Sequence, residues 1–134
     1  MIILADSGST KTDWCLLDGA KAERVRTAGM NPYFQSEEEM AQTLQTQLLP
    51  AVMDAKAVEA VYFYGAGCAS EAVNEKVARA IAHFFPVSME VQSDLMAAAR
   101  ALCGRKAGIA CIMGTGSNSC AYDGKQITAH VPPM

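Results

Sequence analysis

The chain has 134 residues, of which 51% are hydrophobic and 19% are charged, and it carries a formal net charge of −3 at pH 7. This length can bury one sizeable core but hardly two complete domains. No run of lysine and arginine exceeds two residues, which excludes the basic surface of a typical nucleic-acid-binding protein, and no apolar run is long enough to cross a bilayer. The five cysteines are odd in number and form no CxxC pair, which favours reduced thiols in a cytoplasm over disulfides or a zinc site. We therefore expect a soluble, cytoplasmic protein with no nucleic-acid or membrane partner.

Three strands are predicted at the beginning of the chain, at residues 2–6, 11–18 and 22–28, because each of these segments is a short β-type run. The pair Asp18-Gly19, between the second and third of them, is a strong hairpin signal. We expect these strands to form an antiparallel meander.

A first helix is predicted after Ser36, because Ser36 and Glu39 have the spacing of a capping box. One helical face then carries apolar residues until Pro50 disturbs the pattern, namely Met40, Leu44 and Leu48. The remaining elements are predicted from the spacing of their apolar residues, which repeats every three to four residues in a helix and runs continuously or alternates in a strand. They are a strand at 58–64 covered on both faces, a helix with Val73, Val77, Ile81 and Phe84 on one side, a strand at 89–93, a helix at 94–103, a strand at 108–113 and a hairpin at 118–130 that turns at Asp123-Gly124.

The order βββαβαβα predicts an α/β fold, in which a mixed five-stranded sheet has helices on both faces. Ligands of such sheets bind beyond the carboxyl ends of the parallel strands. Asp6 ends the first predicted strand, the glycine-containing segment 65–68 follows the fourth, and Asp94 follows the fifth. We therefore expect these three features at one edge of the sheet.

Two turns rich in glycine and hydroxyl residues follow apolar strands, one at residues 6–12 and one at residues 114–119. Glycine lets backbone N–H groups approach an anion closely, and serine or threonine adds donors with little bulk. This composition favours a clamp on the phosphates of a nucleotide; an ordinary hairpin connection is the alternative for the first turn. The chain contains no GxxxxGK[ST] loop, which excludes a Walker-type site.

These motifs, in this order along nearly the whole chain, resemble those of the actin and sugar kinase superfamily, and within it N-acetylglucosamine kinase and the related BadF-type ATPases. They are Asp6-x-Gly-x-Thr-Lys-Thr-Asp13, Ser93-Asp94 before an alanine-rich helix, and Gly114-Thr-Gly-Ser-Asn118. The resemblance implies an actin-like, ribonuclease H-like lobe. It also implies phosphoryl transfer from ATP, with Mg²⁺, to a hydroxyl group of an amino sugar.

By this resemblance, Asp6 holds Mg²⁺ through water, as a hard oxygen ligand would. The alternative for Asp6 is a cap of the tight turn. The resemblance assigns the ATP phosphates to the two turns, with the residues Gly8, Ser9, Thr10, Lys11, Gly114, Thr115, Gly116 and Ser117.

Asp94 is the candidate catalytic base, because the matching aspartate in the resembled kinases accepts the proton of the sugar hydroxyl. Its alternative role is the N-cap of the following helix. The family often has asparagine before this aspartate, whereas this chain has Ser93. The sugar contacts that the resemblance implies are Asn31, Gly65, Ala66, Gly67, Asp94 and Asn118; a loop asparagine and a simple strand-to-helix connection are the alternatives for Asn31 and for 65–67.

We expect residues 1–105 to form the first lobe and residues 106–134 to be the opening strands of an incomplete second lobe. Such a chain would lack half of the active site, so we expect no turnover from it alone, and self-association, as a homodimer for example, through the unpaired strands. Two other functions remain open on the same fold. One is the activator ATPase of hydroxyacyl-CoA dehydratases, which needs cysteines spaced for an iron–sulfur cluster, and the other is a non-catalytic nucleotide- or sugar-binding module.

Overall fold

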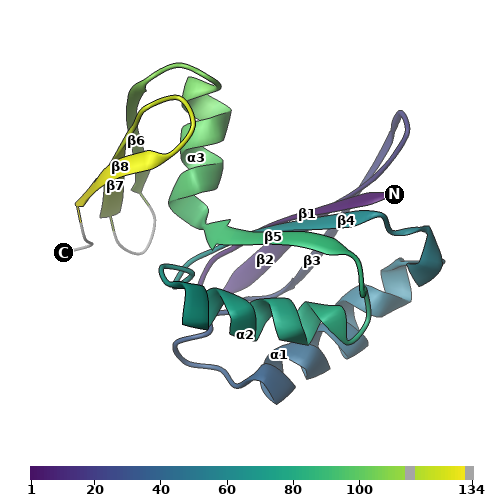
Figure 1. Cartoon of the computed structure of the whole chain (residues 1–134). Helices are drawn as coiled ribbons and strands as arrows, with labels where there is room; N and C mark the ends of the chain where they lie inside the picture. Colours follow the sequence, from purple (N-terminus) through teal and green to yellow (C-terminus); the bar gives the residue numbers. More distant parts are fainter. Residues whose placement is uncertain (114–116, 132–134) are drawn as a thin grey trace. The chain divides into compact units, whose positions relative to one another are not determined.

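The structure is a computed structural model that describes the chain except for residues 114–116 and 132–134. The chain forms two compact units, Met1–Ser93 and Asp94–Met134 (Figure 1). Each unit has its own sheet.

The first unit contains the predicted mixed five-stranded sheet. Its strands are β1 (Ile2–Ser7), β2 (Lys11–Asp18), β3 (Lys21–Ala28), β4 (Ala60–Gly65) and β5 (Ser88–Ser93), in the order β3-β2-β1-β4-β5. The pairs β1–β2 and β2–β3 are antiparallel, whereas β1–β4 and β4–β5 are parallel. The meander is therefore confirmed, and its hairpin turns at Gly19, whose φ of 62° is a conformation that glycine adopts without strain.

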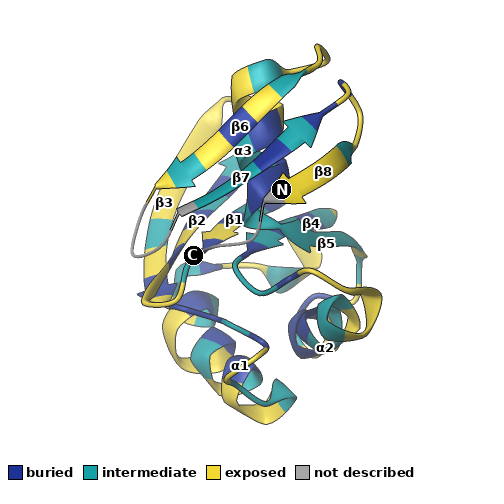
Figure 2. Ribbon diagram, turned by 90° about the vertical axis from the view of Figure 1, so that its left-hand side faces the viewer, coloured by how far each residue is buried: buried dark blue, intermediate teal, exposed yellow. Residues whose placement is uncertain are grey.

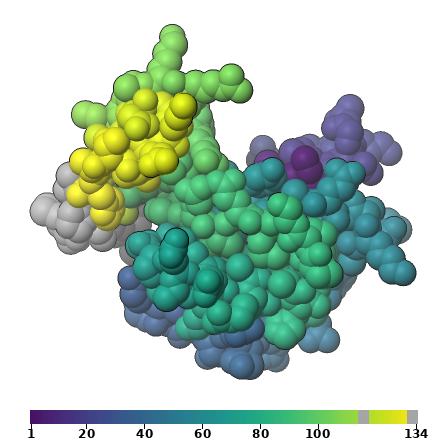
Figure 3. Space-filling view, viewed as in Figure 1, coloured from purple at the N-terminus to yellow at the C-terminus, as the bar shows by residue number. Residues whose placement is uncertain are grey.

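Both helices of this unit lie on the same face of its sheet (Figure 2), and the third predicted helix, at 94–103, belongs to the second unit. These helices are α1 (Glu37–Thr43) and α2 (Glu71–Ala82), which contact each other and are joined by an ion pair of 3.3 Å between Glu37 and Arg79. The space-filling view shows their side chains, blue and teal, meeting along one side of the unit (Figure 3). The reason lies in the strand order: the connections from β3 through α1 to β4 and from β4 through α2 to β5 step in one direction across the sheet. Right-handed crossovers that step in one direction place their helices on one face.

The first helix begins as predicted. The Ser36 side chain accepts a hydrogen bond from the Glu39 backbone, and the Glu39 side chain accepts one from the Ser36 backbone. The α-helix is shorter than the apolar pattern indicates, because it passes into a π-helical segment at Leu44–Leu48 and a 3₁₀ turn at Leu49–Ala51. Pro50 has no N–H group for a helical hydrogen bond, which accounts for the loss of regular helix here.

Two other boundaries differ from the predicted ones. The fourth strand begins at Ala60 rather than at Val58, which is buried but ends a 3₁₀ turn. The second helix ends at Ala82, so Phe84 packs against the core from the segment after it.

The core of the first unit lies between the sheet and these helices. Trp14 and Phe63 pack there with ring centroids 5.9 Å apart, and the indole N–H of Trp14 donates to the Thr27 hydroxyl at 2.9 Å. Trp14 is the only tryptophan of the chain and is 2% exposed, so its fluorescence reports on the folding of this unit.

The second unit is a helix on a three-stranded antiparallel sheet. Its elements are α3 (Asp94–Cys103), β6 (Gly108–Met113), β7 (Ser117–Tyr122) and β8 (Ile127–Val131), in the sheet order β6-β7-β8. The helix packs against β6 and β7 and buries Leu95, Met96, Ala99, Ala110, Cys120 and Tyr122. Burial raises the pKa of the Cys120 thiol above its usual value, as expected for a packed and unreactive side chain. The predicted boundary at 105/106 falls after α3, whereas the compact units divide before it.

The outer side of β6 carries exposed apolar side chains. Ile109 is 76% exposed and Met113 is 87% exposed, and β6 is an edge strand of its sheet. Charged residues or a proline usually protect an open edge from pairing with another chain. The segment Gly108–Met113 contains neither. No helix in the described part of the chain is long and apolar enough to cross a membrane.

Candidate functional site

The carboxyl ends of the three parallel strands are aligned at one edge of the first sheet. Ser7 pairs with Gly65, and Gly65 pairs with Ser93, so the last residues of β1, β4 and β5 form one row. Asp6 precedes Ser7 and is exposed, and Asp94 follows Ser93 directly as the first residue of α3. The predicted edge of the sheet is therefore confirmed for the strand ends.

The predicted nucleotide turn joins β1 to β2 at this edge. The Gly8 amide donates to the Lys11 carbonyl at 2.8 Å, which closes the turn, and Ser9, Thr10 and Lys11 are all exposed. Hydroxyl groups and a lysine are thus presented to the solvent from a tight turn, the arrangement that contact with an anion requires.

Two hydroxyl residues, Ser7 and Thr12, lie beneath this turn; the sequence interpretation placed both in the phosphate-binding segment 6–12 and gave neither a contact of its own. Ser7 and Thr12 are 0% exposed, and their Oγ atoms are 2.8 Å apart. The alternation of β1 contained a signal for Ser7, because it continues the inward-facing positions of Ile3 and Ala5. A hydroxyl group at such a position needs a hydrogen-bond partner in the core.

The segment that leads from β3 to Asn31 is held against the turn. The Gly29 amide donates to the Thr10 carbonyl at 3.2 Å. A Cβ atom at Gly29 would lie 2.6 Å from the Gly8 carbonyl oxygen and equally close to the Ser9 carbonyl group. Only glycine allows this approach of two backbone segments.

The predicted substrate residues Asn31 and Gly67 are brought together. Gly67 has a φ of 81°, and a Cβ atom there would lie 2.5 Å from the Asn31 side-chain oxygen. That oxygen accepts a hydrogen bond from the Tyr33 amide at 3.0 Å, which fixes the orientation of the Asn31 amide. No described residue accepts a hydrogen bond from the Asn31 side-chain nitrogen, which leaves a donor for a ligand.

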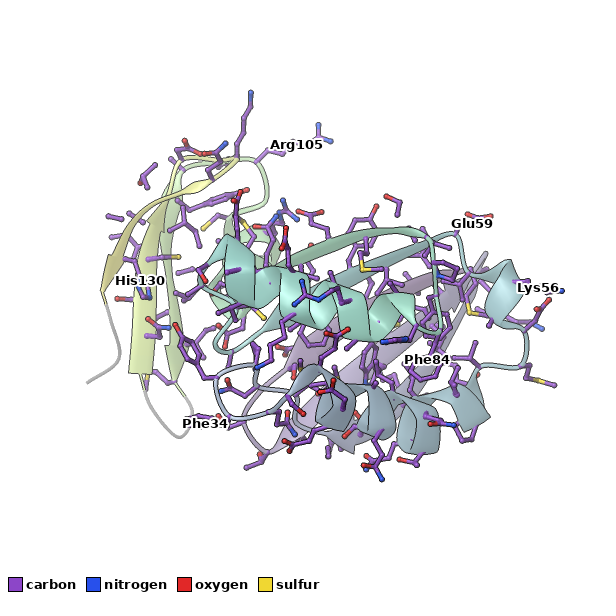
Figure 4. The ribbon with its side chains drawn as sticks, turned by 60° about the horizontal axis from the view of Figure 1, so that its bottom comes forward. Phe34, Lys56, Glu59, Phe84, Arg105 and His130 are labelled. Atoms are coloured by element: carbon purple, nitrogen blue, oxygen red, sulfur yellow. The ribbon has the colours of Figure 1, made fainter. Side chains whose placement is uncertain are left out.

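Two further predicted substrate residues of the first unit, Gly65 and Ala66, adjoin the nucleotide turn. The Ala66 amide donates to the Ser7 carbonyl at 2.8 Å, and Gly65 is the β4 residue paired with Ser7. The first unit thus collects the predicted nucleotide turn and four predicted substrate residues, Asn31, Gly65, Ala66 and Gly67, in one region. Phe34 extends from the loop after Asn31 (Figure 4) and is 82% exposed.

The second unit holds the remaining predicted residues. Asp94 lies in the first turn of α3, where the positive end of the helix dipole favours a carboxylate. Gly114, Thr115 and Gly116 lie outside the described residues, and Ser117 begins β7. The Asn118 side-chain oxygen and the His130 Nε2 atom are 2.8 Å apart, which pairs a predicted substrate residue with a histidine of β8 (Figure 4) that had no assigned role.

Acidic, histidine and cysteine side chains gather into no group of three suited to a metal ion among the described residues. The predicted Mg²⁺ contact of Asp6 through water needs only one exposed carboxylate. Asp6, near the end of β1, is an exposed carboxylate of this kind.

The fold is that of the actin-like ATPases. The chain superposes on the ethanolamine utilization protein EutJ of Carboxydothermus hydrogenoformans with a TM-score of 0.64, covering 98% of this chain and 51% of that one at 14% identity. A non-polymerising MamK mutant bound to AMPPNP superposes with a TM-score of 0.69, covering 97% and 53% at 12% identity. At these identities the likeness concerns the fold alone.

A third structure is also similar in sequence. It is the "putative N-acetylglucosamine kinase" of Porphyromonas gingivalis, with 47% identity and a TM-score of 0.91 over 98% of this chain. This chain spans 47% of the length of the Porphyromonas protein. The predicted resemblance to N-acetylglucosamine kinase, within the actin and sugar kinase superfamily, is confirmed. No protein-family model and no curated protein sequence matches the chain.

Proposed function

We propose that this chain is the N-terminal part of an ATP-dependent kinase that phosphorylates a hydroxyl group of N-acetylglucosamine. The observation that carries the proposal is the 47% identity, with a TM-score of 0.91, to the Porphyromonas protein. The gathering of the nucleotide turn and the substrate residues in one region of the first unit supports it.

In this proposal the exposed turn at Gly8–Lys11 contacts the ATP phosphates, and Asp6 holds Mg²⁺ through water. Bound Mg²⁺ neutralises charge on the phosphates during transfer. The Asn31 amide and the backbone of Gly65–Gly67 bind the sugar. Asp94 accepts the proton of the sugar hydroxyl while its oxygen bonds to the γ-phosphorus, and ADP leaves with the bonding electrons of the broken P–O bond.

A chimera gives the direct test of this function. The chain replaces the matched N-terminal half of the Porphyromonas protein, and ADP release is measured with ATP, Mg²⁺ and a panel of hexoses and N-acetylhexosamines. We expect a response to N-acetylglucosamine but not to glucose. The unaltered Porphyromonas protein is the positive control. Activity of that protein without activity of a folded chimera would contradict the proposal.

Two substitutions separate the proposed subsites in the chimera. Asp6→Ala removes the metal-directed carboxylate and should raise the KM for ATP about tenfold, with little change in the KM for N-acetylglucosamine. Asn31→Ala removes an amide contact to the sugar and should do the reverse. Steady-state kinetics with each substrate varied in turn measure both values. An exchange of the two phenotypes would show that the subsites are assigned the wrong way round.

Gly67→Ala tests the loop beside Asn31. A side chain at a φ of 81° is strained. The added Cβ would lie 2.5 Å from the side-chain oxygen of Asn31 and would displace it. We expect the KM for N-acetylglucosamine in the chimera to rise about tenfold through the loss of one hydrogen bond. Gly104→Ala is the matched control, because Gly104 has a φ of 61° and no atom within 4 Å of its Cβ position. Equal KM values in the two variants would remove Gly67 from the substrate loop.

The chain alone is expected to be inactive and to self-associate. Actin-like kinases close two lobes around ATP, and this chain spans 47% of its relative. The open β6 edge with exposed Ile109 and Met113 is the expected contact. Sedimentation at increasing concentration should show dimers or larger species, and Ile109→Lys should suppress them, whereas Met53→Lys, at a residue that is 98% exposed in the first unit, should not. Sugar phosphorylation by the pure chain, or a monomer at all concentrations, would contradict this expectation.

A further inference from the structure

The hydroxyl groups of Ser7 and Thr12 form a buried bridge beneath the nucleotide turn. Both residues are 0% exposed, and their oxygens lie 2.8 Å apart. Burial of a hydroxyl group without a partner is costly, so this pair is held to a small number of arrangements.

The bridge continues to the segment that precedes Asn31. The Met30 amide donates to the Ser7 Oγ at 3.1 Å, and the Thr12 hydroxyl donates to the Ala28 carbonyl at 3.0 Å. If Ser7 then donates to Thr12, the hydrogen bonds run in one direction from the Met30 amide to the Ala28 carbonyl. In the alternative arrangement Thr12 donates to Ser7, and Ser7 donates to the Met30 carbonyl at 3.2 Å. Each arrangement uses both hydroxyl protons.

Ser7 is also hydrogen-bonded to the segment 65–67, which contributes the other residues of the proposed substrate loop. Its carbonyl accepts the hydrogen bond from the Ala66 amide at 2.8 Å. Ser7 therefore contacts the segment before Asn31 through its side chain and the segment 65–67 through its backbone, while the next residue, Gly8, begins the nucleotide turn.

We propose that Ser7 and Thr12 are positioning residues, which couple the nucleotide turn to the substrate loop at Asn31. This inference rests on the proposed function for the identity of the two ligands. A ligand that orders the turn at Gly8–Lys11 orders Asn31 through the bridge. By linkage, a sugar that orders Asn31 strengthens nucleotide binding by the same factor. Neither residue contacts the reacting atoms in this role.

Amide hydrogen exchange of the 134-residue chain tests the coupling without any ligand. The variant Thr12→Val keeps the size of the side chain and removes no hydrogen bond of Asn31, since the Asn31 amide donates to the Gln35 side chain. We expect exchange of the Asn31 amide to become about tenfold faster, the effect of one lost hydrogen bond, with exchange of the Phe63 amide in the core unchanged. Thr12→Ser should restore the slow rate. Thr46→Val, which removes an exposed hydroxyl on another segment, is the matched control.

Two results would overturn the coupling. One is an unchanged rate at Asn31 in Thr12→Val, and the other is a rise shared equally by Asn31 and Phe63, which indicates a loss of global stability alone. A titration of the chimera with N-acetylglucosamine and MgADP, followed at the same amides, addresses the ligands separately. Absence of sugar binding there would count against the proposed substrate, while the exchange result still decides on the bridge.

Discussion

Replacement of Asp94 by asparagine in the chimera is expected to lower the turnover number for N-acetylglucosamine by about 10²- to 10⁴-fold, the usual contribution of a general base. The amide has the size of the carboxylate and can still act at a helix N-terminus, so we expect the KM values and the folding to change little. Asp94 lies directly after the strand end where the predicted ligand residues gather, in the first turn of α3.

Asp18→Asn is the matched control for this experiment, because asparagine before Gly19 suits the hairpin turn as well as aspartate does. Its turnover should equal that of the unsubstituted chimera. A turnover number of Asp94→Asn within a few-fold of the control would remove Asp94 from the catalytic role and leave it as a helix cap.

Gly29→Ala is expected to lower the free energy of unfolding of the first unit by about 1–3 kcal/mol or more, the cost of forcing an atom into a packed site. The added Cβ would meet three backbone atoms at 2.6 Å, none of which belongs to a flexible side chain. The turn at Gly8–Lys11 and the segment before Asn31 must therefore separate. Urea unfolding followed by Trp14 fluorescence measures the loss in this unit alone.

Gly8→Ala serves as the control in the same turn. The nearest atom to its Cβ position is the Lys11 carbonyl oxygen at 3.7 Å, an ordinary contact. We expect its free energy of unfolding to stay within about 1 kcal/mol of the unsubstituted chain. Equal losses in the two variants would contradict the close approach seen at Gly29.

Local patterns predicted most of the elements in this chain. The capping box of Ser36 and Glu39, the hairpin glycine Gly19 and the alternation of β2 each depend on residues close in sequence. The alignment of the strand ends at the candidate site could also be predicted, because the carboxyl ends of parallel strands share one edge of the sheet.

The bridge beneath the turn could not be predicted in this way. The alternation of β1 places the Ser7 side chain inward, but only the structure shows that the Met30 amide and the Thr12 hydroxyl are its partners. Met30 is 23 residues away along the chain, so this contact is selected by tertiary packing. The face on which α2 lies depended likewise on the order of all five strands, which no single segment specifies.

The pairing of β1 with strands from two parts of the chain has a consequence for the order of folding. Its antiparallel partner β2 follows after a turn of three residues, whereas its parallel partner β4 begins only at Ala60. Closing the longer loop costs more conformational entropy, so we expect the meander to form early and β4 to dock later. Until then one edge of β1, with the run Ile2-Ile3-Leu4, is open to other chains. In a cell, this interval during synthesis is when the protein would depend most on chaperones.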